Sequence, residues 1–378
     1  MAQDTETPTI AFVRYSGSAP IAQASDGTLD SLEAYGYLTP AERAAINESY
    51  DLYGEKVVLL YRDAGFDLPS VNLMVEDVLD KGADVILTIT TQVAQIAVNA
   101  TRDMEDPPAI LFSLTTPFDT GIADSLCIKP DHVAGTQPVM SFEQYVPLVV
   151  LQDPDIQVIG TIVTPDQDIS ILGTRLIKEI GESLGLTVEV ATATSLADVS
   201  FAAESLLDQG AEAIVLPVNP LTAQAMPVLV QLTTEYGVAL YAPRLNAVFR
   251  GATVAAGFQG FYHEGVIAAR ILHAHLIGDI DIADLSIHQS FGFGIAVNLD
   301  TAAEQGIEIS DDLLAMATFV VENGQRSQDV TADVDEVSMT LHEMSSEERR
   351  AADLEFLAGL ECTDEMIAEQ QVALDAAK

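Results

Sequence analysis

Two stretches of the chain repeat one another and restrict the folds that it can adopt. The first, GADVILTITTQVAQ, begins at Gly82, and the second, GAEAIVLPVNPLTAQ, begins at Gly210. Setting Gln95 on Gln224 gives an offset of 129 residues (224 − 95), and the same offset sets PAILFSLT on GVALYAPR. Repeats of this length indicate a duplicated structural unit. Two strands with a helix between them, written twice, predict a duplicated α/β unit.

The length and the hydrophobic pattern extend this prediction to two lobes. A chain of 378 residues with 48% hydrophobic content is too long for one ordinary core. Apolar runs bounded by turn residues alternate with amphipathic stretches, as in parallel sheets covered by helices. The expected strands are TIAFVRYS, EKVVLLYR, DVILTIT and AILFS in the first lobe, and VIGTIVT, TVEVAT, AIVLPV and ALYAP in the second. The expected helices are residues 71–81, 92–102, 171–184, 197–209 and 221–236.

The C-terminal part of the chain differs in composition from the two lobes. After Asn298 we expect one more helix and strand, which complete the second lobe. Residues 325–378 are polar and acidic, and we expect a helical extension there that packs on a lobe or on a partner. Its first helix is predicted by the capping box SSEE at Ser345, and its second helix begins at Thr363.

The net charge of the chain argues against nucleic-acid binding, and the length of its apolar stretches argues against a membrane span. The chain has 58 acidic and 16 basic residues, a formal net charge of −42. Such a surface repels phosphate backbones and anionic membranes, so we expect no nucleic-acid binding. The apolar stretch GVIAARILHAHLIG is interrupted by Arg270, His273 and His275, so it predicts no membrane span.

The search for catalytic and metal sites gives no candidate. The sequence has no GxxxxGK, GxSxG or HExxH motif, so we expect no enzyme and no bound cofactor. His273 and His275 lie two residues apart on a helix and point in different directions, so we expect surface positions and no metal. Cys127 and Cys362 are the two cysteines, and they leave one disulfide open as an option.

Polar residues gather after the expected strands, where parallel sheets bind ligands. The first lobe offers RYSGSAP from Arg14, TTQ from Thr90 and TTPFD from Thr115. The second offers TPDQDIS from Thr164, and then Asn219 and Arg244, each after a later strand. Each hydroxyl or amide alone is an ordinary helix cap. Together they predict a polar small-molecule cleft between the lobes, in which at least one arginine, Arg244 before Arg14, binds an anionic group. The alternative for either arginine is a structural ion pair with one of the many carboxylates.

Several phrases, in order, resemble those of a known family. They are DVILTITTQVAQIAVNAT, TTPFD, VAGT at Val133, IGTIVTPDQDIS and YHEGVIAARIL from Tyr262. From Pro8 to Gly324 the chain resembles the solute-binding proteins of ABC transporters, in the group associated with tryptophan and tyrosine. The resemblance implies two doubly wound parallel-sheet lobes joined by a hinge, a type I periplasmic-binding-protein fold. The implied lobes are residues 8–135 with 258–293, and 136–257 with 294–324, with 325–378 as the helical extension.

The resemblance also implies the function and the ligand contacts. We expect a monomeric extracytoplasmic receptor that closes on a solute by bending near Thr136, Gly257 and Phe293, and delivers the solute to an ABC permease. The implied contacts are Ser16, Thr90, Thr91, Gln92, Thr115, Thr116, Thr164, Asp166, Ser170 and Asn219. The residues themselves add Arg14, Tyr15, Ser18, Phe118, Arg244 and Phe258, the aromatic rings being expected to support an apolar body.

The location and the ligand leave alternatives open. The start, MAQDTETPTIAF, has no export signal and resembles a polar tether; removal of a signal would leave such a start, so it does not settle the location. The resemblance implies a periplasmic or otherwise extracytoplasmic location, with or without a membrane tether. Where amino-acid-binding members carry acidic residues, this chain has Val218 and Gly260. A buried ammonium group needs a carboxylate partner, so we expect a carboxylate- or amide-bearing solute without a free α-amine. A sensory module of the same fold is the alternative function.

Overall fold

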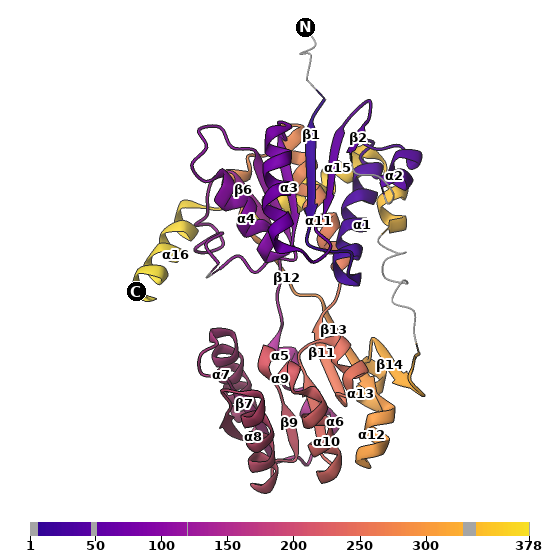
Figure 1. Cartoon of the computed structure of the whole chain (residues 1–378), viewed down its shortest axis with the longest axis vertical. Helices are drawn as coiled ribbons and strands as arrows, with labels where there is room; N and C mark the ends of the chain where they lie inside the picture. The colour runs from indigo at the N-terminus through magenta and orange to yellow at the C-terminus, as the bar shows by residue number, and fades with distance from the viewer. Residues whose placement is uncertain (1–6, 47–50, 119, 328–337, 378) are drawn as a thin grey trace. The chain divides into compact units, whose positions relative to one another are not determined.

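The computed structural model describes residues 7–46, 51–118, 120–327 and 338–377, and the chain forms two compact units (Figure 1). Unit 1 comprises the described residues up to Pro138, Gly260–Ser290 and the described residues from 338 onward. Unit 2 comprises Val139–Gln259 and the described residues from 291 to 327. The polar tether expected at residues 1–6 lies outside the described residues.

Unit 1 contains a seven-stranded sheet in the order β12-β6-β5-β4-β1-β3-β2. All neighbouring strands are parallel except β2, which is antiparallel to β3. The strands are β1 (Thr9–Arg14), β2 (Asp51–Tyr53), β3 (Val58–Asp63), β4 (Val85–Ile89), β5 (Ala109–Ser113), β6 (Val133–Pro138) and β12 (His288–Ser290). Every residue of β4 and β5 is buried, as expected of continuous apolar strands covered on both faces.

Helices cover both faces of the sheet in unit 1 (Figure 1). The helices of unit 1 are α1 (Ala19–Ala34), α2 (Pro40–Ile46), α3 (Leu68–Asp80), α4 (Thr91–Thr101), α11 (Phe261–Leu276), α15 (Ser346–Ala358), α16 (Asp364–Ala377) and the short 3₁₀ helix η2 (Ile282–Asp284). Helices α1 and α11 approach closely because both carry glycine at the contact. A Cβ on Gly27 would lie 2.0 Å from the Tyr262 carbonyl oxygen, and one on Gly265 would lie 1.9 Å from that of Ala24.

Unit 2 contains an eight-stranded sheet in the order β15-β14-β13-β11-β10-β9-β7-β8. The strands are β7 (Val158–Val163), β8 (Thr187–Thr192), β9 (Ala213–Val215), β10 (Ala239–Ala242), β11 (Val254–Phe258), β13 (Phe293–Asn298), β14 (Phe319–Glu322) and β15 (Gln325–Arg326). The helices are α5 (Phe142–Tyr145), α6 (Leu148–Gln152), α7 (Asp168–Ser183), α8 (Leu196–Asp208), α9 (Pro220–Gln224), α10 (Met226–Tyr236), η1 (Leu245–Arg250, 3₁₀), α12 (Leu299–Gln305) and α13 (Asp311–Met316). The sheet is mixed, because β11 with β13 and β14 with β15 pair antiparallel.

The repeated phrases form equivalent units. The first gives β4, α4 and β5, and the second gives β9, α9 with α10, and β10, with parallel neighbouring strands in both. The single helix expected at residues 221–236 is wrong, since it is divided at Ala225. Pro227 lies in the first turn of α10, where its missing N–H fits the start of a new helix. The single helix expected after Asn298 is likewise two helices, α12 and α13.

The C-terminal extension packs on unit 1 from residue 338 onward, whereas residues 325–326, expected to belong to it, form β15 in the sheet of unit 2. The expected capping box of α15 is present at Ser345. Asp353 of α15 is 2% exposed; it accepts a 2.6 Å hydrogen bond from the Tyr35 hydroxyl and forms an ion pair with Arg270, Nε to Oδ1 2.6 Å. A disulfide joins Cys127 to Cys362, the option that the sequence left open.

His273 is not the surface side chain that the sequence predicts. Its ring is half-buried and stacks on Tyr35 with centroids 4.0 Å apart, and its Nδ1 lies 3.1 Å from the Tyr37 hydroxyl. The reason is that α11 packs against α1 and the segment that follows it, which supplies both tyrosines.

Candidate functional site

Two neighbouring strands of unit 1 end in backbone conformations that are unusual for their residues. Thr90, after β4, has φ +90° and ψ 153°, and Leu114, after β5, has φ +52°. The first is a region that essentially only glycine occupies, and such strain persists where the surrounding structure enforces it, often at ligand sites. The Thr90 N–H donates to the Ser113 carbonyl at 3.1 Å, so the two strained ends are joined directly.

Polar groups around these strand ends include buried hydroxyls without partners. Thr90 begins α4 as its N-cap, but its hydroxyl caps nothing and has no hydrogen-bond partner among the described residues. The Thr88 and Ser113 hydroxyls are unpartnered in the same part of the chain. Buried polar groups are normally paired, so orphan groups beside strained backbone are the features expected where a solute binds.

The other predicted residues of these two loops have different surroundings. Thr115 is fully buried and donates to the Ser113 carbonyl at 3.1 Å. The Thr116 N–H donates to the Thr91 hydroxyl at 3.0 Å, which ties the loop after β5 to the start of α4. Thr116 and Gln92 are exposed. Phe118 is partly buried against the apolar cluster on the α3 and α4 side of the sheet.

Arg14, at the end of β1, is an ion-pair partner inside unit 1. Its Nη2 lies 2.7 Å from Asp63 Oδ2, and its guanidinium carbon lies 5.1 Å from the centre of the Tyr61 ring. The Arg14 Nη1 also donates to the Ser25 hydroxyl of α1 at 3.4 Å. The arrangement follows from the register, in which Arg14 and Asp63 are partners on parallel strands. The guanidinium is therefore already engaged by protein groups.

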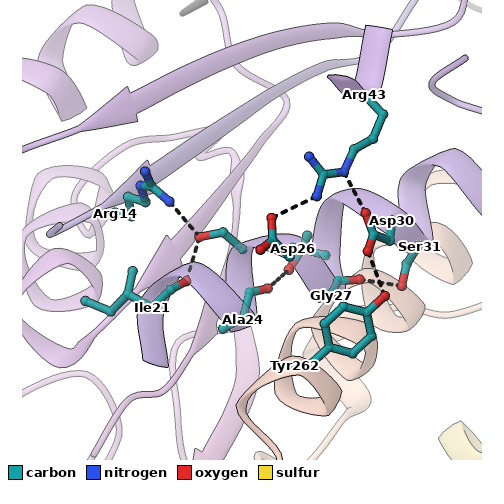
Figure 2. A network of polar contacts seen from close by, with 11 residues as sticks. Arg14, Ile21, Ala24, Asp26, Gly27, Asp30, Ser31, Arg43 and Tyr262 are labelled. Atoms are coloured by element: carbon teal, nitrogen blue, oxygen red, sulfur yellow. Dashed lines mark hydrogen bonds and ion pairs between the residues drawn. The ribbon is translucent and has the colours of Figure 1, made fainter. Parts of the chain in front are cut away.

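Arg43 is a second arginine of unit 1 that forms ion pairs with aspartates, here on α1. Figure 2 shows Arg43 between Asp26 and Asp30, at 2.8 and 2.7 Å, while the Tyr262 hydroxyl of α11 donates to Asp30.

The remaining predicted residues near β1 form local contacts. Ser16 is buried, and its hydroxyl lies 3.4 Å from that of Ser18. The Tyr15 hydroxyl donates to the Phe66 carbonyl, and the two rings meet edge to face. Because β1, β4 and β5 are parallel neighbours, these residues share one edge of the sheet with Thr90 and Thr115.

In unit 2, Thr164, Ser170 and Asn219 form one buried network. The Asn219 Nδ2 donates to the Thr164 hydroxyl at 2.9 Å and to the Ser170 hydroxyl at 3.1 Å. Its Oδ1 accepts from the N–H groups of Leu221 and Thr222 at the start of α9. An amide has two donor hydrogens and one oxygen acceptor, so the side chain of Asn219 is fully used. The structure thus brings these three residues together, and their mutual hydrogen bonds hold the loops after β7 and β9. Asp166 is exposed beside them, and Phe258 is half-buried at the end of β11.

A cavity of 310 Å³ lies within unit 2 at the carboxyl ends of β9 and β10. Its lining residues are Leu216, Pro217, Val218, Asn219, Pro220, Thr222, Ala223, Met226, Ala242, Pro243, Arg244, Asn246, Ala247 and Arg250. Arg244, which the sequence predicts as a contact in the cleft between the lobes, lines this cavity within unit 2. Arg250 and Asn246 lie in the stretch PRLNAVFR after β10 but were not singled out, because their 3₁₀ helix has no hydrophobic period to reveal it.

A buried carboxylate in unit 1 was also missed. Glu264 of α11 is 0% exposed and accepts a 2.6 Å hydrogen bond from Thr136 of β6. Burial raises the pKa of Glu264, while hydrogen bonds from Ser290, from Thr136 and from the Leu114 backbone act in the opposite direction. Burial of Glu264 could have been suspected from its helical spacing, because Phe261 and Ile267 lie three residues before and after it and share its face of α11.

Neither a metal cluster nor a membrane span is found in the described ranges. No three His, Cys, Asp or Glu side chains in that part of the chain lie together as metal ligands would. Among the helices that the structure describes, none combines the length and the apolarity that crossing a bilayer requires.

Comparison with known proteins identifies the family. The family model described as ABC transporter substrate binding protein matches residues 48–321. The chain belongs to this family. This substrate-binding protein is 24% identical over 251 residues to a tyrosine-binding protein of Clostridioides difficile strain R20291, an alignment that covers 66% of this chain and 70% of the relative.

Solved structures confirm the expected two-lobe fold of this substrate-binding protein. A ligand-free, open substrate binding protein with adhesive properties from Clostridium difficile is 22% identical with a TM-score of 0.66, over 80% of this chain and 96% of that one. A Streptococcus pneumoniae ABC domain in complex with L-Trp is 20% identical with a TM-score of 0.60, over 83% of this chain and 100% of that one. The fold is the type I periplasmic-binding-protein fold that the sequence predicts.

Proposed function

We propose that this chain is the extracytoplasmic receptor of an ABC transporter, which binds one small solute without turnover and delivers it to a permease. The family match supports the binding role. The observation that carries the proposal to particular residues is the pair of strained strand ends at Thr90 and Leu114, with unpartnered hydroxyls beside them. Unit 1 holds strain and orphan polar groups where ligands of parallel sheets bind, and a solute would satisfy those groups.

The disulfide supports the extracytoplasmic location. The bond between Cys127 and Cys362 accounts for both cysteines of the chain. Disulfides persist in oxidising compartments and are rare in reducing ones. The described residues contain neither a metal cluster nor a helix with the length and apolarity needed to cross a membrane.

The proposed solute differs from the amino acids named for two relatives. One relative is named for tyrosine, and one similar structure holds L-Trp. Val218 and Gly260 stand here at the two positions where the resemblance implies acidic residues, and Gly260 has φ +99°, a conformation that suits glycine. Both positions lack a carboxylate for an α-ammonium group. We therefore propose a polar or carboxylate-bearing solute without a free amine.

The proposal is tested by recovering the solute and by measuring transport. Protein purified from its own host under native conditions should release one dominant small molecule on denaturation, identified by mass spectrometry and rebound in calorimetry. A host without the gene should then take up that molecule more slowly. Absence of any released or rebinding solute would contradict the binding role.

A sensory module remains the second candidate, because α16 exposes apolar side chains. Val372 is 70% exposed and Ile367 is 40% exposed. Normal solute uptake in the deletion strain, together with a lost transcriptional response to the solute, would favour this candidate over transport.

A further inference from the structure

We propose that the cavity in unit 2 binds the carboxylate end of an amphiphilic organic acid, with Arg244 and Arg250 as its two anion-binding groups. The inference rests on the proposed function, since it names the solute class of a solute-binding protein. It adds Arg250, a second cation, and it places the apolar body of the solute within unit 2.

The cavity has the size and the floor of a small-ligand site. Its 310 Å³ lies at the lower end of the range of about 300–1,000 Å³ that is usual for ligand pockets. Its buried apolar lining includes Leu216, Met226 and Ala242, each 2% exposed, and Ala247 at 8%. An apolar floor of this kind accommodates a short alkyl or aromatic body.

The charge of the cavity is opposite to that of the chain. The chain has 58 acidic residues and a formal net charge of −42, yet no acidic residue is among those that line the cavity, and two arginines are. Arginine binds carboxylates with paired hydrogen bonds, and such charge-assisted bonds are stronger than neutral ones. The lining therefore favours an anion and disfavours a cation.

Other arginines are occupied by protein groups, whereas these two are not. Ion pairs in which a guanidinium nitrogen lies 2.8 Å or less from an aspartate oxygen are formed by Arg14, Arg43, Arg62, Arg270 and Arg350. Arg102 and Arg349 donate to backbone carbonyls. By contrast, the guanidinium groups of Arg244 and Arg250, both exposed, form neither a hydrogen bond nor an ion pair with any residue that the structure describes. Unpaired guanidinium groups at one cavity leave their binding capacity to a ligand.

The backbone fixes Arg244 at the cavity. Arg244 is the N-cap residue of η1, directly after β10, and Arg250 is the last residue of the same 3₁₀ helix. The loop that carries Arg244 lies against β11, because a Cβ on Gly257 would be 3.3 Å from the Pro243 carbonyl oxygen. Asn219, on the other side of the cavity, has its amide fully used, so it leaves the polar contacts to the arginines and to the exposed Asn246.

The test uses the full chain and defined probes. A series of carboxylates from butanoate to 3-phenylpropanoate, each compared with its amide and with the amine of the same body, is titrated at millimolar concentration. Binding is followed by the side-chain N–H resonances of arginine and by calorimetry. We expect at least one carboxylate to shift the Arg244 and Arg250 resonances. The amide of the same body should bind at least about tenfold more weakly than the carboxylate, and the amine should not bind.

Matched variants separate specific contact from general charge. R244A and R250A should each weaken carboxylate binding about tenfold or more. R175A should change it less than about twofold, because Arg175 is an exposed arginine of unit 2 outside the cavity whose weak ion pair contributes little. Equal binding of carboxylate and amide, tighter binding of the amine, equal effects of R175A and R244A, or no resonance shift in the series would each overturn the inference.

The two proposals can fail independently. If the solute recovered from the host binds wild type, R244A and R250A equally, the inference fails and solute binding stands. If the carboxylates bind through both arginines but the deletion strain takes up the recovered solute normally, the inference stands and the transport role fails.

Discussion

Replacing Thr90 by glycine should stabilise unit 1 while weakening its hold on the solute. At φ +90° and ψ 153°, a residue with a Cβ carries strain on the order of 1–3 kcal/mol, which glycine removes. The substitution also removes a buried hydroxyl without a partner, whose desolvation costs roughly 1–3 kcal/mol. The greater freedom of glycine in the unfolded chain returns about 0.5–1 kcal/mol. We expect a net increase of about 1–5 kcal/mol in the free energy of unfolding of unit 1.

Hydrogen exchange in increasing urea is the suitable assay, because peptides from β4 and β5 report on unit 1 separately from unit 2. The chain contains no tryptophan, so protein fluorescence is a weak alternative. Thr88→Val is the matched control, since it removes an equally orphaned hydroxyl from a regular strand position and relieves no backbone strain. An unstable T90G protein, or a gain no larger than that of T88V, would refute the argument from strain. Retention of the recovered solute by T90G would refute its connection to binding.

Three further substitutions test other parts of the structure. Glu264→Gln removes a carboxyl group whose pKa is raised above 4.5 by burial, so the wild-type protein loses stability as this group becomes charged at higher pH. The melting temperature of the variant relative to wild type should therefore increase from about pH 4 to about pH 8. A difference that stays constant with pH would contradict this. Asp353→Ala leaves Arg270 of α11 without its partner, so it should release α15 and lower the free energy of unfolding by about 3–5 kcal/mol. Asp279→Ala breaks an ion pair with Arg350, whose side chain is 57% exposed, and should cost less than about 1 kcal/mol. Similar hydrogen-exchange rates of α15 in the two variants would contradict this difference. Gly27→Ala forces a Cβ to within 2.0 Å of a carbonyl oxygen, so a loss of at least about 1–3 kcal/mol is expected, and an unchanged urea midpoint would show that α1 can move away freely.

The strands that the sequence predicts are present because each has a local cause, whereas β2, β6, β11, β12, β13, β15 and helix α1 were not predicted. The apolar runs DVILTIT and AILFS are buried on both faces of a sheet, and the repeat predicts that they are neighbours. The break at Ala225 was missed because the apolar spacing continues through it, while Pro227 shows it only on close inspection.

The roles of the site residues depend on contacts that sequence position does not reveal. Arg14 and Arg244 both follow strands, yet the first faces Asp63 across a parallel pair and the second lines a cavity. Knowledge of the β1–β3 register would have been needed to separate them. Asn219 was predicted as a ligand contact from its place after β9, but the number of its hydrogen bonds, visible only in three dimensions, makes it a support for α9.

The disulfide between Cys127 and Cys362 closes a covalent loop of the chain that contains the whole of unit 2. Both cysteines belong to unit 1, and the residues of unit 2 lie between them in the chain. A protease that cuts once inside unit 2 therefore produces two fragments that stay linked until a reductant is added. The loop also imposes an order on biosynthesis, because the ribosome must complete unit 2 before Cys362 emerges. During that interval the thiol of Cys127 is unpaired, and its thiolate can attack disulfides of other molecules in the compartment where the chain matures, which releases a thiol and leaves a mixed disulfide.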